Sequence, residues 1–195
     1  MDKIYISGLH NFIRSLLARG LVLLLVPLLF VEGQRIHVNP DTRMKAVFLM
    51  NFTRYISWTT LDTAQVFTIG VYGLDGILLP LKQLSRERKA AGQVVNIKRV
   101  SKTEEIEGCE ILFVPIAQTE AFHKLRPDIP PENILIVGES LGFATSDGAI
   151  NFIKRNGKIK LEINREALAE AKLSASSQLL KLAILVGEEN IQARD

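Results

Sequence analysis

The sequence predicts an α/β protein built on a mostly parallel sheet. Helix-like and strand-like segments alternate along residues 39–137, an order typical of parallel strands joined by right-handed helical crossovers. The predicted strands are short and continuously apolar, as in sheets that are covered on both faces. Asn156-Gly157 lies between two further strand-like segments and indicates a hairpin, whose antiparallel strand is expected to close the sheet.

Local signals place the first helix and the first strand. Asn39 suits the N-cap position and Pro40 the first helical position, so a helix is predicted from about 41 to 56. The β-prone run at 66–72 predicts a buried strand, which ends in a glycine-rich turn at 73–76.

The remaining elements follow from the same periodicity. In order, they are a helix with apolar residues at 78, 81 and 84 that Gly92 stops, a strand over 94–100, a short acidic helix over 101–107 capped by Ser101 or Thr103, a strand over 111–115, a helix near 118–125, a strand over 133–137, hairpin strands over 149–154 and 158–163, a helix after the Asn164 cap and a helix over 174–186. Together they predict a Rossmann-like three-layer arrangement in which the C-terminal β-hairpin contributes one antiparallel strand. The last helix is apolar on two sides, so it is either packed between layers or offers a surface to a partner.

The N-terminus has the pattern of a cleavable signal peptide. Three basic residues precede a charge-free apolar run over 20–31, which is shorter than the roughly 20 residues needed to span a bilayer. Cleavage before Gln34 assigns 1–33 to the signal peptide and 34–195 to a single domain. The mature chain is therefore expected to be exported without a membrane span.

Charge, cysteine and histidine content bear on nucleic-acid binding, disulfide formation and metal binding. Residues 1–33 carry three bases and two acids, so their removal lowers the formal net charge from +3 to +2. No basic run remains, which gives no support to nucleic-acid binding. Cys109 has no internal disulfide partner and leads into an apolar run, so burial is expected over pairing with another chain. His37 and His123 add no metal-ligand spacing, and neither a metal nor a cofactor is expected.

Two glycine motifs resemble a hydrolase nucleophile turn and a nucleotide-binding turn, but each lacks a further feature that such a site requires. Residues 138–142 match G-x-S-x-G after a strand, the pattern of a hydrolase nucleophile, yet no histidine follows Ser140 to act as base. Residues 70–76 read GxxGxxG, which is not the GxGxxG spacing of a dinucleotide site. We therefore predict no catalytic residue and a non-enzymatic function.

Polar residues on predicted apolar surfaces are the remaining candidates. Asn51 lies on the apolar side of the first helix, where its amide either ties the helix to a neighbour or lines a pocket, and Trp58 is interpreted in the same way. Strict alternation over 158–163 directs Glu162 outward, opposite to Leu161.

Several segments together resemble the YfiR-like family of periplasmic proteins, over about Met44 to Val186. The segments that carry the resemblance are Lys45 to Phe52 with Trp58, Phe67 to Gly73, Gly108 to Val114, Gly142-Phe143, Gly148 to Phe152, Leu161 to Asn164 and Ser176 to Ala183.

This resemblance implies a non-catalytic repressor or sensor in the periplasm. Such proteins are soluble, often dimeric, and bind the periplasmic part of a membrane-bound diguanylate cyclase, while related domains precede histidine kinases. It also implies a partner-binding region around Glu162, Asn164 and Leu168. Relatives can carry disulfides, one through a cysteine matching Cys109, but this chain has no second cysteine.

A periplasmic small-ligand binder is the alternative function. It requires a pocket with convergent polar groups, and the candidate lining residues are Asn51, Trp58, Gly142, Phe143 and Asn151. A repressor instead requires an exposed apolar patch.

Export with cleavage is directly testable. N-terminal sequencing of the protein from the periplasmic fraction is expected to begin near Gln34, because small residues precede that position. An intact Met1 in the membrane fraction would contradict the prediction.

Overall fold

The computed structural model describes residues 38–59, 66–90 and 92–187. The helices are α2 (Pro40–Tyr55), α3 (Leu78–Glu87), α4 (Thr119–Leu125), α5 (Phe143–Ser146), α6 (Arg165–Glu170) and α7 (Ser177–Leu182), with 3₁₀ turns η2 (Thr103–Glu105), η3 (Ile116–Gln118) and η4 (Arg126–Asp128). The strands are β1 (Ile56–Trp58), β2 (Phe67–Tyr72), β3 (Val95–Val100), β4 (Ile111–Val114), β5 (Leu135–Gly138), β6 (Ile150–Arg155), β7 (Lys158–Asn164), β8 (Leu173–Ala175) and β9 (Ile184–Val186). The predicted signal peptide and His37 lie outside the described residues.

Seven strands form one mixed sheet in the order β3-β2-β4-β5-β6-β7-β9. The five strands β2, β3, β4, β5 and β6 are parallel to one another. β7 is antiparallel to β6, and β9 runs parallel to β7. A separate antiparallel pair is made by β1 and β8. The predicted α/β class with a mostly parallel sheet is confirmed.

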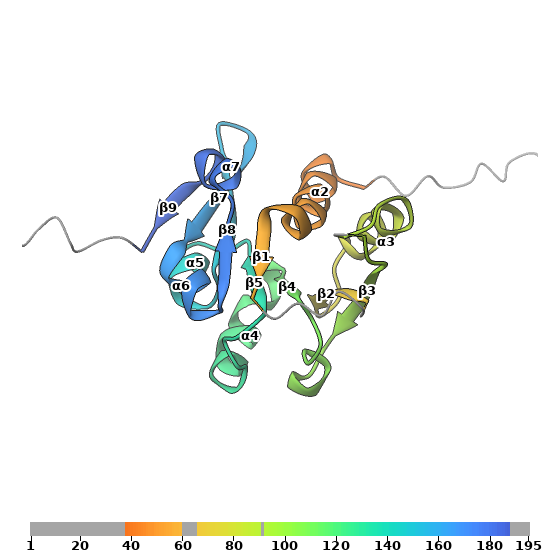
Figure 1. Cartoon of the computed structure of the whole chain (residues 1–195), viewed down its shortest axis with the longest axis horizontal. Helices are drawn as coiled ribbons and strands as arrows, with labels where there is room; N and C mark the ends of the chain where they lie inside the picture. The colour runs from red at the N-terminus through yellow and green to blue at the C-terminus, as the bar shows by residue number, and fades with distance from the viewer. Residues whose placement is uncertain (1–37, 60–65, 91, 188–195) are drawn as a thin grey trace, which may run out of the picture. The chain divides into compact units, whose positions relative to one another are not determined.

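The sheet separates two hydrophobic cores. Because successive side chains of a strand point to opposite faces, Ile111 and Phe113 of β4 enter one core, while Leu112 and Val114 enter the other. Helices α2 and α3 lie on one side of the sheet and α4 on the other (Figure 1). All residues of β2, β4 and β5 are buried, so both faces of these strands are covered, as the continuous apolar runs predict.

Helix α2 begins and packs as its sequence predicts. Asn39 accepts a hydrogen bond from the Asp41 backbone nitrogen at 2.9 Å, which confirms the N-cap. Further along the helix, Phe48 and Phe52 contact Phe152 of β6, with ring centroids 6.0 and 6.2 Å apart. These rings fix α2 over the β6 region of the sheet.

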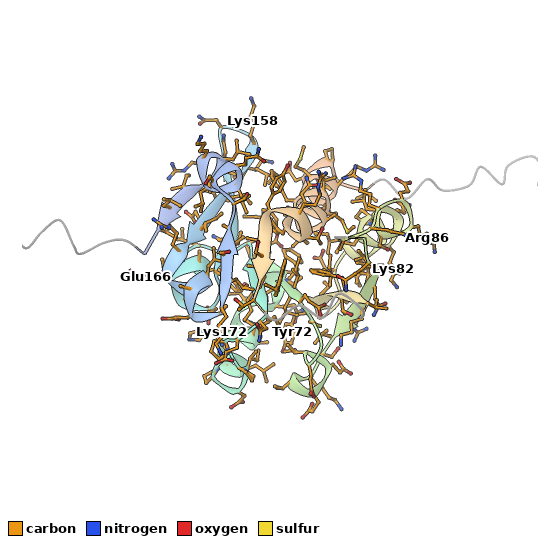
Figure 2. The ribbon with its side chains drawn as sticks, in the orientation of Figure 1. Tyr72, Lys82, Arg86, Lys158, Glu166 and Lys172 are labelled. Atoms are coloured by element: carbon orange, nitrogen blue, oxygen red, sulfur yellow. The ribbon has the colours of Figure 1, made fainter. Side chains whose placement is uncertain are left out.

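The predicted hairpin is also confirmed. Strands β6 and β7 pair from Arg155 with Lys158 to Ile150 with Ile163. Between them, Asn156 and Gly157 have φ values of 51° and 72°, as a type I′ turn requires at both central positions. The Lys158 side chain extends from the tip of this hairpin (Figure 2).

The predicted helix over 174–186 is wrong at both ends. Only α7 is helical, while the residues before it belong to β8 and those after it to β9. β8 gains backbone hydrogen bonds by pairing with β1, and β9 by pairing with β7. The β-branched residues Ile184 and Val186 also favour an extended backbone. Pairing with distant strands therefore overrides the local helical pattern.

Two smaller expectations are corrected as well. The hairpin does not close the sheet, because β9 adds a further strand beyond β7. The acidic segment 101–107 forms a single 3₁₀ turn with Lys102 as N-cap, not a helix capped by Ser101 or Thr103. Glu105 instead accepts a hydrogen bond from the Ser101 backbone nitrogen at 2.6 Å.

Phe143 of α5 occupies space that two glycines leave open. A Cβ at Gly138 would overlap the Phe143 ring. A Cβ at Gly148 would lie 2.5 Å from the same ring and 2.7 Å from the Ile136 carbonyl oxygen. The absence of side chains at these two positions therefore lets Phe143, which is buried, close the second core.

Gly138→Ala is expected to destabilise the protein by about 1–3 kcal/mol, because a well-packed core cannot accept the extra carbon without displacing the ring. Gly76→Ala is the matched control: nothing lies within 4 Å of its added Cβ, so the free energy of unfolding should stay within about 1 kcal/mol of the parent value or rise. Urea unfolding measures both. Equal stability of the two variants would show that Phe143 does not fill this space.

A candidate partner-binding face on the sheet

One face of β6, β7 and β9 carries a row of directly opposed residues. Asn151 pairs with Glu162, and Glu162 pairs with Ile184 across the next strand. Ile153 pairs with Lys160, and Asn164 pairs with Val186. Opposed residues in a sheet share a face, so these side chains form one surface. We call Ile153, Lys160, Glu162, Ile184 and Val186 the β7 face.

The β7 face is less covered than the opposite face of the same strands. On the opposite face, Phe152, Leu161 and Ile163 are fully buried in the core beneath α2. On the β7 face, Lys160 is exposed, and the other four members are half-buried. The surface is thus a partly open aliphatic patch with one carboxylate and one ammonium group, a composition suited to contact with another protein.

Glu162 is held by a buried amide. The Asn151 Nδ2 donates a hydrogen bond to Glu162 Oε2 at 2.9 Å, and Asn151 is 0% exposed. Glu162 points away from Leu161, as alternation predicts, but it is half-buried and not freely solvated. The buried partner restricts the carboxylate to one position on the β7 face.

Asn164 uses its side chain within the fold. Its Oδ1 accepts hydrogen bonds from the backbone nitrogens of Glu166 and Ala167 at 3.0 and 3.1 Å, which confirms the predicted cap of α6. Its Nδ2 donates to the Ala144 carbonyl oxygen at 3.0 Å. The amide therefore joins α5 to α6, and its polar groups are engaged by the backbone.

The five candidate pocket residues are divided between the two sides of the sheet. Asn51 lies on α2, over the first core. Phe143 is buried in the second core, and Asn151 points to that same side, next to Glu162. Gly142 has a φ of 76° and precedes α5, while Trp58 packs edge-on against Phe67 with centroids 5.2 Å apart. Residues separated by the sheet cannot line one pocket.

Asn51 instead lines an apolar groove between α2 and α7. The groove has a volume of about 450 Å³ and is lined by Phe48, Asn51, Phe52, Tyr55, Gln178, Leu179, Lys181 and Leu182. Leu179 is buried, whereas Leu182 is 71% exposed. Of the two leucines predicted on one side of the last helix, Leu179 therefore packs into the core and Leu182 offers apolar surface to solvent.

The G-x-S-x-G segment has a packing role. Gly138 accommodates Phe143, and the Ser140 hydroxyl oxygen is buried without a hydrogen-bond partner. His123 Nδ1 lies 2.7 Å from Asp147 Oδ1, so the histidine is paired with a carboxylate and not with Ser140. Ser146 donates to the other oxygen of Asp147 at 2.6 Å. These contacts connect α4 to the turn after α5, and they do not assemble a nucleophile with its base.

Neighbouring side chains fill the space next to the glycines of residues 70–76. The strand order reverses between β2 and β4, which is where open α/β sheets commonly bind ligands. Here a Cβ at Gly73 would lie 2.8 Å from Gln118 Cδ, so Gln118 occupies this position. Gly70 lies inside β2, and its added Cβ would be 2.9 Å from Cys109 Sγ.

Cys109 is buried and free, as expected. Burial raises the pKa of its thiol, and the nearby Lys98 acts in the opposite direction. Within the described part of the chain, no group of three or more histidine, cysteine, aspartate or glutamate residues is arranged to hold a metal ion.

A family model described as YfiR/HmsC-like matches residues 42–184. The chain belongs to this family. No curated protein matches the sequence. Membership indicates a periplasmic regulator in diguanylate cyclase signalling. None of the helices formed by residues 38–59, 66–90 and 92–187 is long and apolar enough to cross a bilayer.

The resemblance to this family also placed Leu168 on a surface shared with Glu162, outside the core. That expectation is wrong, because Leu168 is 3% exposed and belongs to the first core. Helix α6 returns the chain from β7 to β8, and Leu168 packs inward with Ala171 and Leu173. Glu162 is the residue of the pair that remains on a partly open surface.

Leu168→Ala is expected to lower the free energy of unfolding by about 2–5 kcal/mol, the usual cost of emptying a buried leucine site. Ala169→Ser on the same helix is the control, because Ala169 is exposed and should change stability by less than about 0.5 kcal/mol. Denaturant unfolding measures both. A Leu168→Ala protein of parental stability would contradict the burial.

Proposed function

We propose that this protein is a non-catalytic repressor that binds the periplasmic part of a membrane-bound diguanylate cyclase through the β7 face. In this proposal, residues 1–33 direct export and are removed, and the mature domain acts in the periplasm. Binding holds the cyclase inactive, so the cyclic-di-GMP level rises when the repressor is lost or released.

The observation that carries the proposal is the fixed carboxylate in an aliphatic, partly open sheet face. An ion pair formed in such a place on binding is partly desolvated and can fix the register of the partner. The aliphatic members Ile153, Ile184 and Val186 supply area for hydrophobic contact. Family membership supports the class of partner.

The sheet edge next to the β7 face offers a second mode of contact. β9 is the last strand in the sheet order, and Leu185 in it is 40% exposed. Edge strands pair readily with an extended segment of another chain. A partner strand added at β9 would lie beside the β7 face, so both contacts can serve one interface.

Glu162→Lys tests the proposal in cells that lack the endogenous gene and carry a plasmid-borne copy. The change reverses the charge of a proposed interface anchor, which typically costs 2 kcal/mol or more of binding, roughly 30-fold. We expect the parent to restore a low cyclic-di-GMP level and Glu162→Lys to leave it high. Mass spectrometry of cell extracts measures the nucleotide.

Two controls separate binding from folding. Glu166→Lys makes the same charge change on α6, where the side chain is exposed (Figure 2), and should repress as the parent does. Glu162→Gln removes the charge but keeps an acceptor for Asn151, so it avoids most of the roughly 1 kcal/mol stability cost of the lost hydrogen bond. Full repression by Glu162→Lys, at parental levels in the periplasmic fraction, would refute this site.

A further inference from the structure

A second cavity lies at the opposite edge of the parallel strands from the turn after β2. It is formed by the segment that enters β4 and the segment that enters β5, and its volume is about 490 Å³. Its lining is Thr103, Glu104, Ile106, Glu107, Gly108, Cys109, Glu110, Ile129, Pro130, Glu132, Asn133 and Ile134. This volume is within the range of small-molecule sites, roughly 300–1,000 Å³.

The cavity combines an apolar interior with a negative rim. Ile106, Ile129 and Ile134 are buried and supply aliphatic surface. Four of the twelve lining residues are glutamates, and none is a lysine or an arginine. Apolar contact and negative potential therefore act on the same occupant.

Two nearby lysines offset only part of this charge, and Lys98 also attracts the Glu110 carboxylate. Lys172 Nζ pairs with Glu132 at 2.7 Å, and Lys98 Nζ donates to the Glu107 carbonyl oxygen at 3.1 Å. The carboxylates of Glu104 and Glu107 are exposed and enter none of the ion pairs found among the described residues. Both remain available to a bound cation.

Two inner groups of the lining are hydrogen-bond acceptors. Asn133 Oδ1 is buried and has no hydrogen-bond partner, although such a group normally finds one. The residue is held at a φ of 63°, while its backbone nitrogen donates to the Ala171 carbonyl oxygen at 2.8 Å. Glu110 accepts from the Thr68 backbone nitrogen at 2.5 Å, and burial raises the pKa of its carboxyl. A positively charged donor would pair with the Asn133 oxygen and would offset the cost of burying the Glu110 carboxylate.

We infer that this cavity binds a small organic cation with an apolar body, such as a primary alkylammonium ion. The ammonium group has three donors and no acceptor, which matches the glutamate carboxylates and the Asn133 oxygen. The alkyl chain matches the isoleucines. This site lies on different strand ends from the β7 face and does not depend on the proposed repressor function.

The experiment compares three probes of one chain length by isothermal titration calorimetry on the purified protein. n-Hexylammonium is expected to bind saturably, while hexan-1-ol and hexanoate are expected to show no saturable binding at the same concentrations. Equal binding of the alcohol would show an apolar site without charge selection and would overturn the inference. Failure of all three probes to bind would overturn it as well.

Substitutions at Asn133 test whether the probe binds in the cavity. They do not strain the backbone, because asparagine, aspartate and glycine all tolerate the positive φ of this residue. Asn133→Asp adds a carboxylate and is expected to tighten n-hexylammonium binding. Asn133→Gly removes the unpaired oxygen and is expected to weaken it. Unchanged affinity in both variants would show that the probe binds elsewhere and would refute the site.

A double substitution tests the rim. Glu104→Gln with Glu107→Gln is expected to weaken binding about two- to thirtyfold, the range for two exposed ion pairs. Glu87→Gln with Glu170→Gln makes the same change in net charge at exposed residues outside the cavity and should leave the affinity unchanged. An equal loss in both double variants would indicate a general charge effect and would overturn the inference.

Discussion

The burial of β2, β4 and β5 on both faces is the constraint on which the rest of this structure depends. Strands with no polar face must be covered on each side, because exposure of either face would leave several large aliphatic side chains in water. Helices α2 and α3 provide one cover, and α4 and α5 contribute to the other. The two cores are consequences of this single requirement.

Beyond β5, helices cover less of the face that borders the second core, and the residues on that face change from apolar to polar. β6 and β7 place Asn151, Glu162 and Asn164 on that face, where β4 and β5 place Leu112 and Ile136. Asn164 forms hydrogen bonds through both ends of its amide, which avoids the cost of a buried unpaired group. Asn151 donates to Glu162 through Nδ2, while its Oδ1 is buried without a hydrogen-bond partner. The candidate partner-binding face thus lies where the helical layer on this side of the sheet ends.

The glycines illustrate how one motif can have two explanations. Gly138 and Gly142 match a nucleophile turn by sequence, but Gly138 leaves room for Phe143, and Gly142 provides the positive φ before α5. Ser140 between them has its hydroxyl oxygen buried. Close packing and an active-site turn both require glycine, so the spacing of glycines alone does not distinguish a packing motif from a catalytic one.

The sequence by itself determined the features that depend on neighbouring residues. The Asn39 and Asn164 caps, the apolar face of α2, the Asn156-Gly157 hairpin and the buried parallel strands follow from local hydrogen bonding, turn geometry and periodicity. The outward direction of Glu162 follows from strand alternation in the same way.

Only the tertiary structure decided the features that depend on distant partners. β8 and β9 replace the ends of a predicted helix because β1 and β7 offer them backbone hydrogen bonds. Leu168 is buried because α6 turns it toward the first core, and the cavity beside Asn133 exists because two segments meet at one sheet edge. Each outcome joins residues far apart in the chain, and periodicity within one segment carries no information about which distant segment completes its contacts.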